Sequence, residues 1–71
     1  MTMRRSVNAK ERYYKIELLP TLFGEVLLIR TFGSVNRLKP TGVIRQTYSD
    51  VQEAMVIMNA LIHAKIKRGY E

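Results

Sequence analysis

The spacing of the apolar residues changes once along the chain, and this change restricts the fold more than any other feature. Before Ser49, apolar and polar residues alternate in short stretches, which is the period-2 pattern of half-buried strands. From Ser49 onward, the apolar residues recur at the spacing of one helical face. Seventy-one residues make one domain. The sequence therefore predicts an α+β fold, in which a small antiparallel sheet of three to four strands packs against one C-terminal helix.

Three segments carry the alternating pattern. The first covers residues 13–19 and ends at a turn whose sequence is PTLFG. The second, residues 25–32, is apolar on both faces, so we expect it to be the central strand of the sheet. The third covers residues 42–48 and follows a loop over residues 33–41. Because the connections are short, the strands are expected to form an antiparallel meander.

The helix has recognisable start and stop signals. Ser49 and Gln52 have the spacing of a capping box, in which each side chain bonds the backbone N–H of the other residue. Gly69 suits a left-handed residue after the last turn. The last turn carries cations that favour the carbonyl end of the helix dipole: Lys65, Lys67 and Arg68. The expected core stripe consists of Val51, Ala54, Met55, Met58, Leu61 and Ile62.

Four apolar residues of the helix fall outside that stripe: Val56, Ile57, Ala60 and Ala64. One helix on one sheet does not obviously cover them, so either a fourth strand or a second subunit must do so. These four residues are therefore the candidate interface of a homodimer.

Residues 1–10 are polar and basic and show no periodicity, which predicts a flexible N-terminal arm before a domain over residues 11–71. No apolar run approaches the roughly 20 residues of a membrane span. No apolar stretch follows the N-terminal charges, as a secretory signal would require. We therefore expect a cytoplasmic protein without membrane contact.

The sequence offers few groups for catalysis. It contains no Cys, one His, one Asp and five Glu. His63 lies in the middle of the helix, and no carboxylate is spaced to orient its ring there. The glycines are isolated at turns, so no glycine-rich phosphate loop exists. We therefore expect a protein that is not an enzyme and that uses no metal, cofactor or small-molecule substrate.

The cations are better organised than the acids. Twelve Lys and Arg against six Asp and Glu give a net charge of +6, which favours polyanionic partners. Arg30 and Phe32 share one face of the second strand, Arg37 and Lys39 follow in the loop, and Arg45 is on the adjoining strand. Such an aromatic ring can stack on a base or sugar while the cations contact phosphates. Alternatively, Phe32 is an ordinary core residue.

The order and spacing of several segments resemble the WGR domain, which is named for a Trp-Gly-Arg at the end of its second strand. These segments are RYYKIELL at 12–19 and GEVLLIRTFG at 24–33, followed by QTYSDVQEA at 46–54. The ending KRGY at 67–70 resembles stand-alone bacterial members. The resemblance covers about residues 12–70 and implies a small antiparallel sheet flanked by a helix.

The resemblance also implies a function. In poly(ADP-ribose) polymerases the WGR domain helps to recognise DNA breaks, with the motif Trp against the sugar and base of a terminal nucleotide. The motif Arg links DNA to neighbouring domains. This sequence has Phe32-Gly33-Ser34 instead: a Phe can still stack with less area, but a Ser cannot replace a guanidinium.

Two functions follow from the sequence. The favoured one is a nucleic-acid-binding module, with DNA ends or breaks as its expected ligand. The other is a protein–protein interaction or homodimerisation module that does not bind nucleic acid. The candidate nucleic-acid site consists of Arg30, Phe32, Gly33, Arg37, Lys39 and Arg45.

Overall fold

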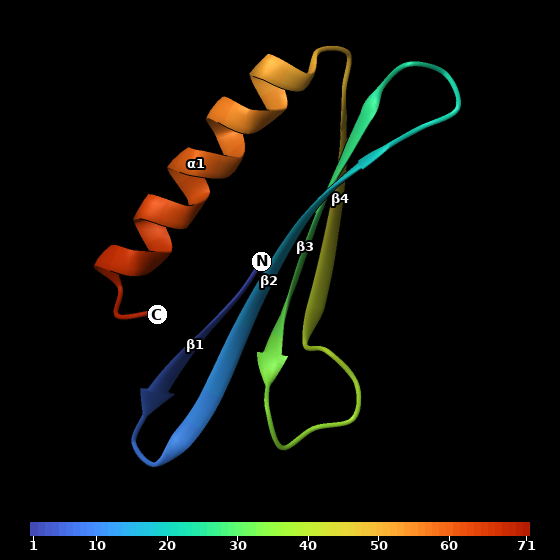
Figure 1. Cartoon of the computed structure of the whole chain (residues 1–71). Helices are drawn as coiled ribbons and strands as arrows, with labels where there is room; N and C mark the ends of the chain where they lie inside the picture. The colour runs from blue at the N-terminus through green and yellow to red at the C-terminus, as the bar shows by residue number, and fades with distance from the viewer.

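The computed structural model describes all 71 residues and contains four strands and one helix. The strands form one antiparallel sheet in the order β1-β2-β3-β4, and the helix α1 lies across one side of it (Figure 1). The α+β fold expected from the sequence is confirmed. The elements are β1 (Thr2–Val7), β2 (Lys10–Pro20), β3 (Val26–Ser34), β4 (Gly42–Tyr48) and α1 (Val51–Lys67).

The N-terminal residues form a strand and a turn, so the predicted flexible arm is wrong. All of β1 pairs with β2, from Thr2 opposite Lys15 to Val7 opposite Lys10. Asn8 and Ala9 connect the strands with φ values of 51° and 66°, and two positive φ values are the geometry that fits a two-residue hairpin. The sequence gives no sign of this strand because Met3 is its one buried side chain. Its two apolar residues, Met3 and Val7, are separated by three polar residues and show no period.

The two sides of the sheet differ because alternate side chains point to opposite sides. We call the side beneath α1 the helix face and the other side the open face. The buried core lies on the helix face and consists of Met3, Tyr14, Ile16 and Leu28, with Ile57, Met58, Leu61 and Ile62 of α1 packed against it. On the open face lie Tyr13, Glu17, Leu19, Leu27, Ile29, Thr31, Val43 and Arg45.

The start of α1 differs by one residue from the predicted capping box. Asp50, and not Ser49, is the N-cap, and its carboxylate accepts a hydrogen bond of 3.0 Å from the backbone N–H of Gln52. Asp50 adopts extended angles, with φ −132° and ψ 129°, as an N-cap residue does. The predicted stop is confirmed, since Gly69 follows the helix with φ 99°. The helix lacks the length and apolar composition that crossing a membrane requires.

The four residues of the predicted homodimer interface on α1 differ in exposure. Ile57 packs against the core between the helix and the sheet. Val56 is 69% exposed, and Ala60 and Ala64 are also exposed. α1 lies mainly over β3 and β4, so the added strand β1 does not account for the burial of Ile57.

Candidate nucleic-acid interface

One end of the helix face gathers cations from three elements. Arg30 of β3 lies opposite Ile16, and its position places it beneath α1. Lys65 follows the fully buried Ala54 by about three helical turns, so it lies on the side of α1 that faces the sheet. Its Nζ is 4.6 Å from the centroid of the Tyr14 ring. Arg5 of β1 lies beside it, with its guanidinium 5.9 Å from the ring of the neighbouring Tyr70.

These charges affect one another. The pKa of Lys65 is lowered below its ordinary value of 10.5, first by burial of its ammonium group. Next in size come the positive charges of Arg68, Arg30 and Arg5. A lowered pKa means that the surroundings disfavour the charged form of Lys65. The protein therefore holds this cation where nothing of opposite charge stabilises it.

Aromatic rings form the floor of this region. Tyr14 and Phe32 lie opposite each other on β2 and β3, and their rings stack with centroids 6.3 Å apart and planes at 14°. Tyr70 meets Tyr14 edge-on at 6.2 Å. Gly42 leaves room for Phe32, because a Cβ at position 42 would lie 2.5 Å from its Cζ. The ring of Phe32 is therefore held by the core on one side.

The C-terminal turn holds Tyr70 in place. The backbone N–H of Tyr70 donates to the carbonyl of Lys65 over 3.1 Å. Glu71 exchanges two backbone hydrogen bonds with Arg4 at the edge of β1, with lengths of 2.9 and 2.8 Å. The last residues thus add a short pairing to the sheet edge and position the tyrosine ring beside Arg5.

Two neighbouring pockets open along this end of the sheet. The first, which we call the aromatic pocket, has a volume of about 340 Å³ and is lined by Arg5, Val7, Arg12, Phe32, Lys65, Arg68 and Tyr70. The second, which we call the polar pocket, has a volume of about 540 Å³ and is lined by Lys10, Arg12, Ser34, Asn36, Arg37 and Thr41. Because Arg12 lines both pockets, they form one continuous surface. Phe32 therefore serves as core on one side and as a pocket wall on the other.

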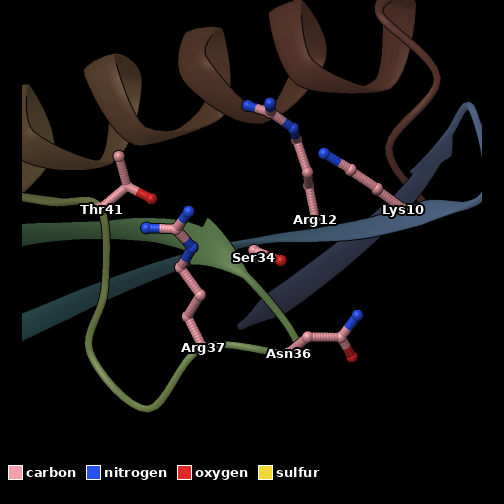
Figure 2. Close-up of a pocket in the computed structure, with 6 residues that line it drawn as sticks. All are labelled: Lys10, Arg12, Ser34, Asn36, Arg37 and Thr41. Carbon is pink, nitrogen blue, oxygen red and sulfur yellow. The ribbon is translucent and has the colours of Figure 1, made fainter.

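Figure 2 shows the polar pocket from the side. Arg12 and Lys10 from the start of β2 and Arg37 from the β3–β4 loop all extend their side chains towards the side of the sheet on which α1 lies. Ser34, Asn36 and Thr41 complete the wall. The lining is entirely polar, and none of it is acidic.

We call the cations at these two pockets, together with Arg30, the cationic surface: Arg5, Lys10, Arg12, Arg30, Arg37, Lys65 and Arg68. None of them is in an ion pair, since the single ion pair of the structure joins Lys15 to Glu17 over 3.4 Å on the open face. Two buried polar atoms lack a hydrogen-bond partner, namely the hydroxyl of Tyr14 and Nε of Arg30. Both belong to side chains of this region. Unpaired cations and unsatisfied donors together are suited to an anionic ligand.

The structure brings together some of the sequence-predicted site residues and separates others. Arg30, Phe32 and Arg37 belong to the region just described. Arg45 lies opposite Ile29, which places it on the open face, on the other side of the sheet. Lys39 is exposed in the β3–β4 loop and lines neither pocket.

Gly33 has a structural part in this arrangement. A Cβ there would lie 2.9 Å from the backbone nitrogen of Thr41 and 3.2 Å from Cα of Pro40. The loop thus folds back closely over Gly33, and the N–H of Thr41 donates to the carbonyl of Phe32 over 2.9 Å. This close approach fixes the loop that carries Arg37.

Sequence reasoning missed several members of the region: Arg12, Lys65, Arg68 and Tyr70. Lys65 and Arg68 already had a simpler explanation, because cations in the last turn favour the carbonyl end of the helix dipole. A usable signal existed, because Lys65 continues the apolar stripe of α1 at helical spacing from Leu61 and Ile62. A cation on the core side of a helix is the feature that needs a functional explanation.

The structure contains no group of three or more His, Cys, Asp or Glu side chains that could hold a metal ion. Comparison with curated proteins and comparison with solved structures each found no match. The WGR domain family, by contrast, matches residues 1–71, and this match includes β1 as well as the segments that resemble the family. The chain therefore belongs to the WGR domain family.

Proposed function

We propose that this protein is a non-enzymatic nucleic-acid-binding module that contacts phosphates with the cationic surface and stacks a sugar or base on Phe32. The observation that carries this proposal is the gathering of seven cations without a carboxylate partner. WGR domains are known from nucleic-acid-binding proteins, which supports the same conclusion.

The electrostatics favour a polyanion over a neutral ligand. Burial and neighbouring arginines already lower the pKa of Lys65, so the free protein bears the cost of like charges held close together. A phosphate group at this position would offset that cost and would accept hydrogen bonds from several guanidinium groups at once. Phosphate contacts of this kind supply most of the non-specific affinity of nucleic-acid-binding proteins.

The aromatic pocket supports the choice of DNA ends as ligand. Phe32 forms one wall and Tyr70 another, with Arg5 and Arg68 beside them. A terminal nucleotide can enter such a pocket, whereas a base within an uninterrupted duplex is stacked on both sides. Stacking on an aromatic side chain contributes roughly 1–3 kcal/mol per base and carries no charge.

Binding titrations with short DNA duplexes test the proposal. Blunt, nicked and overhanging duplexes are compared with a duplex closed by hairpins at both ends, over a series of salt concentrations. If about four phosphates are contacted, log affinity falls against log salt with a slope of about −3.6. Tighter binding to open ends than to the closed duplex supports DNA ends as the ligand. Absence of binding to any duplex at low salt contradicts the proposal.

Phe32 variants separate stacking from charge. Phe32→Ala is expected to weaken binding and to leave the salt slope unchanged, because the ring carries no charge. Since Phe32 also packs on Tyr14, thermal melting must show that the variant remains folded. Phe32→Trp introduces the family's own residue and is expected to tighten binding to open ends relative to the closed duplex.

A protein-interaction module is the second candidate function, and exposed apolar side chains favour it. Leu22 and Phe23 in the β2–β3 turn are 99% and 87% exposed, and Leu38 in the next loop is fully exposed. Side chains of this size rarely face water together at one turn without a partner. Failure of the titrations above, together with a protein partner that requires Leu22 and Phe23, would establish this function instead.

A further inference from the structure

The open face of the sheet carries an apolar stripe that no element of the chain covers. Leu27, Ile29 and Thr31 lie along it on the central strand β3. Leu19 on β2 is 43% exposed and Val43 on β4 is 38% exposed. An antiparallel sheet that leaves one face to water normally has polar side chains there. The open side of β3 instead has the composition of a contact surface.

Two opposite charges flank this stripe, one on each neighbouring strand. The strand register places Glu17 and Arg45 on either side of Ile29, one on β2 and the other on β4. Each is therefore about one strand spacing, roughly 4.8 Å, from the central strand. Glu17 forms an ion pair with the exposed Lys15, and Arg45 has no carboxylate partner. In the cross-strand row through Ile29, the face thus presents an apolar side chain between two opposite charges, with Lys15 two residues before Glu17 on β2.

This arrangement is complementary to itself. A two-fold axis parallel to β3 and above Ile29 exchanges the two flanks when a second copy is laid on the first. Glu17 of each copy then lies over Arg45 of the other, while Ile29 meets Ile29 and Leu27 meets Leu27. Such a contact is isologous, and sheets packed with nearly aligned strands are a common arrangement. We propose that the open face binds a second copy of this chain.

Other occupants fit the open face less well. Glu11 and Glu17 lie on this side of the sheet among the cations Arg4, Lys15 and Arg45, so the face lacks the unbroken positive charge that favours a polyanion. Edge-to-edge pairing of two β4 strands would bring Arg45 opposite its own copy in a pairing centred on the strand, and like charges directly opposite each other are destabilising. A second copy stacked face to face covers the apolar stripe and places each flanking charge over one of opposite sign.

The size of the face sets the strength of the dimer. With the axis above β3, only β2, β3 and β4 of the two copies overlap; three strands at a spacing of about 4.8 Å and seven residues at about 3.3 Å cover roughly 14 × 23 Å. This area is smaller than the roughly 800 Å² per partner of a standard stable interface. We therefore expect a weak, concentration-dependent dimer. The cationic surface belongs to the helix face, so the dimer leaves it free and does not depend on nucleic-acid binding.

Charge reversal gives a specific test by sedimentation velocity, over protein concentrations from roughly 1 µM to 1 mM. The wild type is expected to shift from monomer to dimer across this range. Glu17→Arg and Arg45→Glu should each weaken the dimer at least tenfold, because each places like charges over one another twice. The double variant should dimerise again. An equimolar mixture of the two single variants should form a heterodimer, since each then supplies the charge that the other lacks.

Three results would overturn the proposal. The first is a wild type that remains monomeric at the highest concentration. The second is a mixture of the single variants that forms no heterodimer. The third is loss of the dimer in Val56→Glu, a control on the exposed side of α1, with no loss in the charge-reversal variants. Circular dichroism confirms that each variant is folded, as expected for substitutions at exposed or partly exposed positions.

Discussion

On the open face of the sheet, charges of both signs lie side by side, whereas one end of the helix face holds cations alone. Glu17 on the open face is paired with Lys15, and Arg45 occupies the same cross-strand row. On the helix face Arg30 and Lys65 approach each other without any carboxylate. The net charge of +6 is therefore unevenly distributed. The mixed surface suits a copy of itself, and the cationic surface suits a polyanion.

The largest difference between the two faces is expected from neighbouring residues of β3. Leu28 is 1% exposed on the helix face, so Leu28→Ala should lower the free energy of unfolding by about 2–5 kcal/mol through a cavity in the core. Ile29 points to the open face, and Ile29→Ala should cost less than about 1 kcal/mol. Urea denaturation at low protein concentration, where the chain is monomeric, measures both. Equal losses would mean that the open face is buried within the monomer.

A smaller loss of stability is expected from variants at the start of α1. The two faces of the sheet differ because α1 is docked on one of them. Asp50→Ala removes the hydrogen bond to the N–H of Gln52 and should lower the free energy of unfolding by about 1 kcal/mol. Ser49→Ala, one residue earlier, should change it by less than about 0.5 kcal/mol. The same urea measurements apply. A larger loss of unfolding free energy in Ser49→Ala than in Asp50→Ala would favour Ser49 as the N-cap, as the sequence predicts.

The smallest effect on stability concerns Lys65. Because its folded pKa is lowered, the folded state binds this proton less tightly than the unfolded state does. The cost is present in full below the folded pKa and disappears as the pH rises from there to the ordinary value of 10.5. Lys65→Met should therefore raise the melting temperature slightly at pH 7, and this advantage should shrink above the folded pKa. A lower melting temperature would show that the contact with the Tyr14 ring outweighs burial.

The same side chain reports on ligand binding. A phosphate beside Lys65 would favour its charged form, so its pKa should rise when an oligonucleotide binds. NMR titration of the Lys65 side chain with and without a short duplex measures this change. An unchanged pKa in a saturated complex would place the phosphates elsewhere.

Three strands and the helix could be predicted from the sequence because their apolar residues repeat with a clear period. β1 could not, since its single buried residue, Met3, gives no period. Asp50 and Ser49 are adjacent and both suit an N-cap, so sequence alone does not decide between them. Ile57 lies at the border of the apolar stripe, where the way α1 docks on β3 and β4 determines whether it is covered.

The candidate site was harder to predict than the fold. Arg30 and Arg45 are on adjacent strands, and which face each occupies depends on a register that shifts with one residue of loop length. Arg12 and Lys65 are far apart in sequence, and only the hairpin of β1 and β2 and the docking of α1 bring them to one pocket. The charge surplus could be read from composition, but its concentration on the helix face could not.

Removing one arginine from each face tests most directly whether the nucleic-acid interface is confined to the helix face. Arg12 lines both pockets of the cationic surface, and Arg45 lies on the open face. Affinity for an open-ended duplex is measured against salt at protein concentrations that keep the chain monomeric. Arg12→Gln is expected to weaken binding and to flatten a slope of about −3.6 by about one unit. Arg45→Gln should leave both affinity and slope unchanged. Equal losses from the two variants would contradict a nucleic-acid interface confined to the helix face.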